Sequence, residues 1–211
     1  MRVLGLDEAG RGCVLGPLVV GAYFCDDNGP SGQSMDAVVA TGATDSKMLS
    51  RKRREAILLR LADVGESRLV AISPAQIDAG NINALEEAAF IEHIVHFRPH
   101  RVYIDAPVHP KGIAKLKARM AAILAKEGLD PELIVEPKAD ANYPIVGAAS
   151  IVAKVYRDNQ IDALGEVGSG YPSDPTTRAW LSGFLKRGDP LPDCVRKRWG
   201  TIDNLRQQVL F

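Results

Sequence analysis

The chain of 211 residues has few cysteines and no long apolar run, and each shortage excludes a class of protein. Cys13, Cys25 and Cys194 are widely spaced and form no C-x-x-C or Cys/His pattern, so a structural zinc site is not expected. The simplest inference is reduced thiols in a cytoplasm. No apolar stretch approaches the length of a membrane span, and Met1-Arg2 leads straight into a strand-like run rather than a signal peptide. We therefore expect a cytoplasmic protein with no membrane partner.

The sequence also lacks net charge, so no global basic field indicates nucleic-acid binding. The distribution is less even, because Gly168–Phe211 carries seven Lys or Arg against four Asp. A mildly basic C-terminal segment suits a polyanion held against metals, although a solvated helical face explains the charge equally well. A length of 211 residues fits one good-sized domain, or one domain with a modest appendage, and a hydrophobic content of 46% is ordinary for a globular protein.

Short runs rich in Val and Ile alternate with longer helical patterns, which predicts an α/β fold. The expected strands are Arg2–Leu6, Leu18–Cys25, Ser67–Ile72, Arg101–Asp105 and Leu133–Glu136. The first two should pair antiparallel, because the turn between them is too short for a helical crossover. Asp26–Thr44 is rich in Gly, Asp and Ser and is expected to loop out. The expected helices are Arg51–Asp63, Ala84–His96 opened by an Asn83/Glu86 capping box, Gly112–Lys126, Pro144–Leu164, Pro175–Lys186 and Ile202–Leu210.

These elements predict a mixed sheet with helices on its faces, followed by an all-helical tail. We place the boundary between a catalytic domain, residues 1–167, and a C-terminal helical substrate-binding region, residues 168–211.

Four carboxylates occupy positions that suit a shared site. Asp7 and Glu8 follow the first expected strand, Asp105 closes a later one, and Asp140 precedes the Pro144 helix. Side chains at the ends of neighbouring strands can converge, and clustered acids are tolerable only with cations. Oxygen ligands without His or Cys favour Mg²⁺ or Mn²⁺. Each acid also has a plain alternative, as a turn residue or as a charge answering a helix dipole.

The helix that begins at Pro144 has an unusually small surface, built from Gly147, Ala148, Ala149, Ser150 and Ala153. Small residues allow close approach of another backbone or of a sugar-phosphate chain. Ser150 and Lys154 are four residues apart and share one face, which makes a phosphate contact feasible. Tight packing of helix against sheet is the alternative.

Taken together, these segments resemble ribonuclease HII, the type 2 ribonuclease H, and specifically its archaeal form. The matching segments run in family order from Gly5-Leu6-Asp7-Glu8-Ala9-Gly10-Arg11-Gly12, through Asp45-Ser46-Lys47, Asp105-Ala106, Lys138-Ala139-Asp140 and Ala148–Val155 with Arg157-Asp158, to Gly168–Pro175. Cys13 departs from the proline often found after the Gly-Arg-Gly sequence. The resemblance implies a ribonuclease H-like fold with a mixed five-stranded sheet and a C-terminal helical region. It implies an endonuclease of ribonucleotide excision repair and DNA replication.

By that resemblance, the enzyme hydrolyses the RNA strand of RNA–DNA hybrids and incises 5′ of ribonucleotides embedded in duplex DNA. Asp7, Glu8, Asp105 and Asp140 would hold two Mg²⁺ or Mn²⁺ ions, and cleavage would leave 5′-phosphate and 3′-hydroxyl ends. Gly10, Arg11 and Gly12 would contact the 2′-hydroxyl, and Tyr171 would stack at the RNA–DNA junction. Lys47 and Lys154 are candidate phosphate contacts. Without the resemblance, Tyr171 is better explained as a packing residue and each lysine as a solvated surface group.

Other interpretations stay open at this stage. A phosphoryl-transfer ATPase of the actin and sugar-kinase type shares the core but needs two such domains, and a non-catalytic nucleic-acid binder would not need the acids. His93 and His96 share a helix, but they lack further ligands and are read as surface or partly buried histidines. The C-terminal residues 207–211 resemble a sliding-clamp peptide without its aromatic pair, so clamp binding is a weak option. A monomer is expected.

Overall fold

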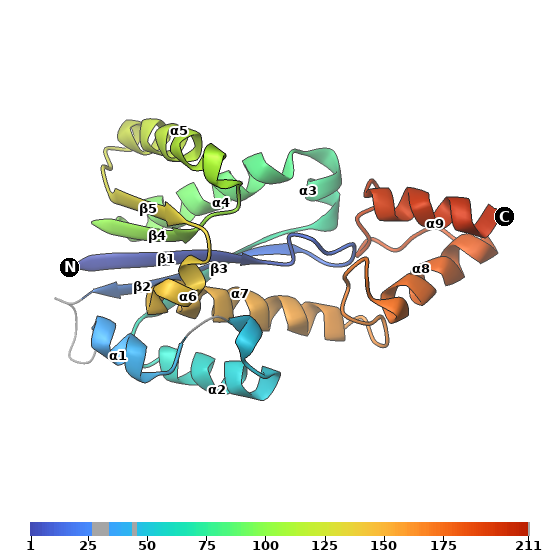
Figure 1. The fold of residues 1–211 in the computed structure, drawn as a ribbon, viewed down its shortest axis with the longest axis horizontal. Coiled ribbons are helices and arrows are strands. Elements are labelled where there is room, and N and C mark those ends of the chain that lie inside the picture. Colours follow the sequence, from blue (N-terminus) through green and yellow to red (C-terminus); the bar gives the residue numbers. More distant parts are fainter. Residues whose placement is uncertain (27–33, 44–45, 211) are drawn as a thin grey trace. The chain divides into compact units, whose positions relative to one another are not determined.

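Strands and helices alternate along the chain in Figure 1, a computed structural model that describes residues 1–26, 34–43 and 46–210. All five expected strands are present. They are β1 (Arg2–Ala9), β2 (Leu18–Asp26), β3 (Glu66–Ile72), β4 (Arg101–Asp105) and β5 (Glu132–Glu136). The prediction that the first strand ends at Leu6 is wrong, because β1 continues through Asp7 and Glu8 to Ala9.

The strands form one sheet in the order β3-β2-β1-β4-β5. β4 pairs parallel to both β1 and β5, with Leu6 opposite Ile104 and Asp105 opposite Glu136. β2 runs back along β1 in Figure 1, which makes the sheet mixed. The predicted α/β fold with a mixed five-stranded sheet and flanking helices is therefore confirmed.

The helices follow most of the sequence signals. They are α1 (Met35–Ala40), α2 (Arg51–Leu61), α3 (Pro74–Ala79), α4 (Ile82–Phe97), α5 (Ile113–Lys126), α6 (Ala139–Asn142), α7 (Pro144–Asp162), α8 (Pro175–Arg187) and α9 (Gly200–Leu210), with 3-10 turns at Ser46–Met48 and Pro110–Gly112. Ser50 caps α2 as expected, since its side chain accepts a hydrogen bond from the Arg53 amide. Asp174 caps α8 in the same way through the Thr176 amide.

Two local predictions fail for reasons of capping. The expected loop over Asp26–Thr44 contains α1, whose first turn is held by the Ser34 hydroxyl accepting from the Ala37 amide. The expected Asn83 cap is wrong as well. The Asn81 side chain accepts from the amides of Asn83 and Ala84, so α4 begins one residue before Asn83.

The chain divides into two compact units that interleave in sequence. The first comprises Met1–Ala9, Val20–Val70 and Glu86–Val155. It holds most of the sheet, with α4 and α5 over one face and α1, α2 and α7 over the other (Figure 1). One buried cluster joins Val3, Tyr23, Ile57 and Leu61 to the apolar stripe of α7. The packing is tight, since a Cβ placed on Gly21 of β2 would lie 2.4 Å from the Ala149 carbonyl oxygen and 3.0 Å from the Ala153 Cβ. The packing alternative for the small residues of α7 is therefore confirmed.

The second unit comprises Gly10–Val19, Ala71–Leu85 and Tyr156–Phe211. Helices α8 and α9 pack together here over a core that includes Val14, Leu15, Leu181 and Ile202. Leu15 forms an isolated antiparallel bridge with Val195. The boundary expected between residues 167 and 168 stays a prediction. Among the described helices, none is both long and apolar enough to cross a membrane.

Candidate active site

Three of the four predicted carboxylates meet in the first unit. Oxygen atoms of Asp7, Asp105 and Asp140 all lie within 4.8 Å of one another, and no other such group of metal-ligating side chains occurs among the described residues. Sheet register explains the first pair, because β1 and β4 are parallel neighbours with Leu6 opposite Ile104. The next residues along the two strands are Asp7 and Asp105, which therefore reach the same level of the sheet.

Asp105 also positions the third acid. Its Oδ1 accepts a hydrogen bond of 3.1 Å from the amide of Ala139, the first residue of α6. The residue before it, Lys138, has a left-handed backbone and makes no capping hydrogen bond through its side chain. The Asp105 carboxylate thus serves as the cap of α6, and Asp140 follows in the first turn, only 3% exposed. Helix α6 is too short to be recognised from sequence periodicity.

Asp7 is buried to a similar extent as Asp140, at 4% exposed. Burial raises the pKa of its carboxyl well above the ordinary value, and the nearby charges of Glu8 and Asp105 raise it further. Hydrogen bonds from the Ser150 hydroxyl and the Glu8 amide, the latter 2.8 Å long, act in the opposite direction. A buried cluster of carboxylates resists full ionisation, and a divalent cation would relieve that cost.

Glu8 does not belong to the group of three. Both acids can face one site only if the strand ends or bulges between them, and β1 instead continues to Ala9. Successive side chains of a regular strand point to opposite faces, which is a sufficient reason for Glu8 to lie outside this group. Glu8 is nevertheless near enough for its charge to raise the pKa of Asp7.

Two of the expected phosphate contacts, Ser150 and Lys154, lie on α7 and differ in exposure. Ser150 is 3% exposed, and its hydroxyl lies 2.8 Å from that of Ser46 as well as bonding to Asp7. Lys154, one turn later on α7, is partly buried. The side chain of Lys47 lies outside the described residues, as do Asp45 and Phe211.

The Gly10-Arg11-Gly12 sequence lies in the second unit together with Tyr171. Gly10 has φ of 83°, and an added Cβ would lie 2.7 Å from the Pro17 carbonyl oxygen, so both conformation and space require glycine. A Cβ on Gly12 would meet only the Tyr171 ring, at 3.8 Å. The Arg11 guanidinium donates to the Asn83 side chain. The structure therefore places the predicted ribose-reading segment against the predicted stacking residue.

Tyr171 lies on a loop that is held by hydrogen bonds to side chains of α8 and of its N-cap residue. The carboxylate of Asp174 accepts from the Ser169 amide at 2.5 Å. A hydrogen bond from the Ser169 side chain, followed by those from the amides of Ser169 and Thr176, lowers the pKa of Asp174 to about 2. The Gly170 amide donates to the Thr177 hydroxyl. The Arg157 guanidinium lies 4.9 Å from the centre of the Tyr171 ring, which is 37% exposed. Burial, followed by the nearby Cys13, raises the pKa of the Tyr171 hydroxyl to about 12, so the phenol stays protonated.

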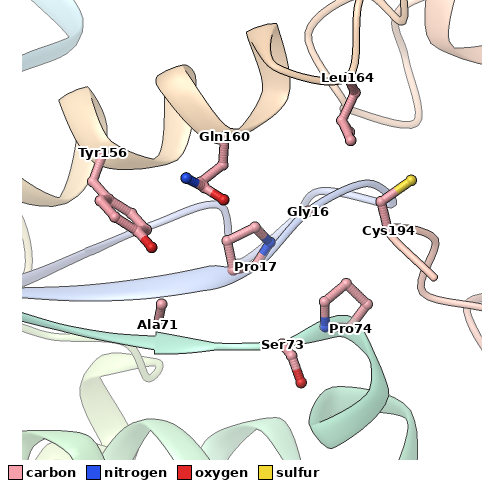
Figure 2. A pocket seen from close by; sticks show the side chains of 9 residues that line it. All are labelled: Gly16, Pro17, Ala71, Ser73, Pro74, Tyr156, Gln160, Leu164 and Cys194. Carbon is pink, nitrogen blue, oxygen red and sulfur yellow. The ribbon is translucent and has the colours of Figure 1, made fainter.

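Two buried arginines of the second unit were not identified from the sequence as site residues. Arg157 is 2% exposed and donates to Cys13 Sγ at 2.8 Å and to the Ser169 carbonyl. Arg196 is fully buried and donates to three backbone carbonyls. The second unit also holds a mainly apolar cavity of about 270 Å³, shown in Figure 2 and lined by Gly16, Pro17, Ala71, Ser73, Pro74, Tyr156, Gln160, Leu164 and Cys194. None of these lining residues is a predicted site residue.

The two histidines of α4, His93 and His96, differ in burial. His93 is fully buried, with Nε2 3.2 Å from the Val20 carbonyl oxygen and Nδ1 3.0 Å from Arg68. The expectation of a surface or partly buried residue is therefore wrong for His93, whereas His96 is exposed. Burial lowers the pKa of His93 to about 4.

Comparisons with known proteins point to one family. A family model described as Ribonuclease HII matches residues 4–202. Ribonuclease HII of Archaeoglobus fulgidus is 37% identical, with 98% of this chain and 97% of that protein covered. Ribonuclease HII of Pyrococcus horikoshii is 39% identical, with coverage of 99% and 94%. The crystal structure of the Pyrococcus horikoshii ribonuclease H2 superposes with a TM-score of 0.84 at 37% identity, covering 100% of this chain and 99% of that one.

A second solved structure, the complex of PCNA with RNase HII from Archaeoglobus fulgidus, has a TM-score of 0.81 to this chain. Its identity is 39%, and 97% of each chain is covered.

Proposed function

The chain belongs to the ribonuclease HII family and is a ribonuclease of the H class, and we propose that it both hydrolyses RNA in RNA–DNA hybrids and incises 5′ of ribonucleotides embedded in duplex DNA. The observation that carries this proposal is the convergence of Asp7, Asp105 and Asp140 within 4.8 Å. Cleavage would leave 5′-phosphate and 3′-hydroxyl ends. Such an enzyme would serve ribonucleotide excision repair and DNA replication.

The donor set fits divalent metal ions. It consists of carboxylate oxygens, which are the ligands that Mg²⁺ and Mn²⁺ prefer, and it contains no sulfur or imidazole. We assign Asp7, Asp105 and Asp140 as ligands, with Glu8 completing a site for two ions. Bound there, the ions would activate the attacking water and stabilise the leaving 3′-oxygen.

The protein's own contribution is to hold the carboxylates before any substrate arrives. Asp105 is oriented by the Ala139 amide, and Asp7 by the Glu8 amide and the Ser150 hydroxyl. These contacts hold the three carboxyl groups together in a site where Asp7 and Asp140 are buried. Carboxylates that are already held in place bind a cation without a cost of rearrangement, so such a site binds cations better than a patch of mobile acidic side chains does.

Recognition of the ribose and of the RNA–DNA junction is assigned to the second unit, and the phosphate contacts to the first. The backbone of Gly10, Arg11 and Gly12 would contact the 2′-hydroxyl, which both donates and accepts hydrogen bonds. Tyr171 would stack on the sugar of the following deoxyribonucleotide, with its ring held against Arg157. Lys47, Ser150 and Lys154 are proposed to act around the phosphates. For Ser150, burial and the bond to Asp7 support an indirect role through that acid. Residues 168–211 would supply most of the remaining duplex contacts.

A sliding-clamp contact through the C-terminus is also proposed. The Archaeoglobus fulgidus relative was crystallised with PCNA, and Gln207 and Gln208 of this chain lie exposed on α9. All three cysteines are free thiols, which supports a reducing, cytoplasmic setting. A monomer is the oligomeric state that we assign.

A labelled duplex with one embedded ribonucleotide tests the proposal. We expect a single incision 5′ of that ribonucleotide with Mg²⁺ or Mn²⁺, and none with EDTA or with an all-DNA duplex of the same sequence. Extension of the product by a DNA polymerase would show the 3′-hydroxyl end. Binding without cleavage would instead indicate a non-catalytic binder, and metal-dependent ATP hydrolysis without incision would indicate the phosphoryl-transfer class.

A further inference from the structure

Arg196 makes an unusual set of contacts for a charged side chain. It is 0% exposed, and its guanidinium donates to the Gly10 carbonyl at 2.6 Å, the Arg11 carbonyl at 2.9 Å and the Gly16 carbonyl at 3.1 Å. Arginine is almost never fully buried unless its donors are satisfied. Here all three acceptors belong to one loop, about 180 residues earlier in the chain.

The backbone around Arg196 is joined to the same loop. The Arg196 amide donates to the Val14 carbonyl at 2.9 Å, and the Gly16 amide donates to the Cys194 carbonyl at 2.8 Å. The Trp199 ring lies 5.0 Å from the guanidinium carbon. These partners are all in the second unit, so every one of these contacts to the loop is made within one compact body.

The direction of these bonds has a consequence for the loop's amides. A trans peptide unit is planar, with its C=O and N–H groups pointing in opposite directions. Arg196 draws the carbonyls of Gly10 and Arg11 toward itself, so the amides of Arg11 and Gly12 point away from it. We propose that Arg196 is a positioning residue for ribonucleotide recognition, which orients the two amides that would meet the 2′-hydroxyl. This inference rests on the proposed function.

The chemistry of the side chain explains why arginine suits the task. A planar guanidinium presents a fork of donors in fixed directions, whereas a lysine ammonium is a compact point charge that cannot hold three carbonyls in one plane. Burial lowers the pKa of Arg196 to about 10, yet that value still leaves it charged at neutral pH. Arg157 is also buried in this unit, so two positive charges accompany the loop and favour a phosphate there.

The test compares Arg196→Lys and Arg196→Gln with Arg60→Lys, a matched change at an exposed arginine of the first unit that has no assigned role in catalysis or binding. Rates on the duplex with one embedded ribonucleotide are measured at saturating and limiting substrate. The temperature is set below the unfolding transition of the least stable variant, as judged by circular dichroism. The rise in melting temperature caused by Mn²⁺ is recorded for each protein as a readout of the acidic site.

We expect kcat/KM of both Arg196 variants to fall about 10- to 100-fold, as the loss of two or three oriented hydrogen bonds predicts. The Mn²⁺-induced rise in melting temperature should be unchanged, and Arg60→Lys should cleave like the wild type. A structural role alone would lower the melting temperature and leave the rate of the folded variant intact. Rates within about twofold of wild type in both folded Arg196 variants would therefore overturn this inference alone. A wild-type protein that leaves the duplex intact would overturn the proposed function as well.

Discussion

Replacing Asp105 by asparagine separates what this carboxylate does for the fold from what it does for the proposed chemistry. The Ala139 amide donates to Asp105 Oδ1, and an asparagine side-chain oxygen can accept the same hydrogen bond. The cap of α6 should therefore survive in Asp105→Asn. The negative charge is lost, and with it one member of the group that holds oxygens within 4.8 Å of one another.

The size of the stability change follows from that spacing. Two unit charges 4.8 Å apart repel by about 3.5 kcal/mol at an effective dielectric constant near 20. Proton uptake at Asp7, whose pKa is raised, relieves part of this repulsion in the metal-free protein. We therefore expect Asp105→Asn to stabilise the metal-free protein by about 1–3 kcal/mol, which is a rise of several degrees in melting temperature for a chain of this size.

Metal addition should make the wild-type protein more stable than Asp105→Asn. A ligand at a thousand times its dissociation constant stabilises the folded state by about 4.1 kcal/mol, so wild-type protein should gain that much from Mn²⁺ at such a concentration. Asp105→Asn should gain little and should not incise the ribonucleotide duplex. Asp130→Asn, at an exposed aspartate of the same unit, serves as the control and should behave like wild type. Retained incision, or a variant less stable than wild type without metal, would refute the charge-cluster reasoning.

Further expectations concern recognition of the RNA–DNA junction and stability at acid pH. Tyr171→Ala should slow incision at a single ribonucleotide about 10- to 100-fold, because base or sugar stacking on an aromatic contributes roughly 1–3 kcal/mol. Tyr171→Phe keeps the ring and should stay close to wild type, and an unchanged junction preference in Tyr171→Ala would make Tyr171 a packing residue. His93 has its folded pKa lowered to about 4 by burial, so the unfolded chain binds a proton below about pH 6.5 that the folded chain does not bind. Stability should therefore fall by up to roughly 3 kcal/mol as the pH drops from 6.5 to 4, and urea unfolding should show a weaker fall in His93→Gln but not in His96→Gln.

The acidic cluster was largely predictable because it depends on strand ends. Val102-Tyr103-Ile104 reads as a buried strand, and the acid after it lies at the carboxyl end of β4 in the structure. The parallel register of β1 and β4 then brings Asp7 to the same level. Glu8 was harder to place, because no local signal showed that β1 would continue to Ala9. It lies outside the group of three converging acids, and a role in holding a second ion stays a prediction.

The helices that the sequence missed are short, and their signals are side-chain caps rather than periodicity. Ser34 holds α1, and Ser73 forms a capping box with Gln76 at the start of α3. Each helix has six residues, which is too few for an apolar stripe to repeat. Asn81, rather than the predicted Asn83, caps α4. Asparagine is a favoured capping residue at either position, so only the path of the backbone determines which of the two caps the helix.

Arg196 illustrates a limit of a different kind. In the sequence it begins a basic run, Arg196-Lys197-Arg198, and such a run is usually a solvated face. In the structure Lys197 and Arg198 are exposed, whereas Arg196 is fully buried with three carbonyl acceptors. Nothing local distinguishes the three, because the acceptors come from a loop near the start of the chain. The same long-range contact makes the function of that loop depend on the C-terminal segment. Truncation before Val195 should therefore disable ribonucleotide reading, even though the truncated chain would keep every carboxylate of the acidic cluster.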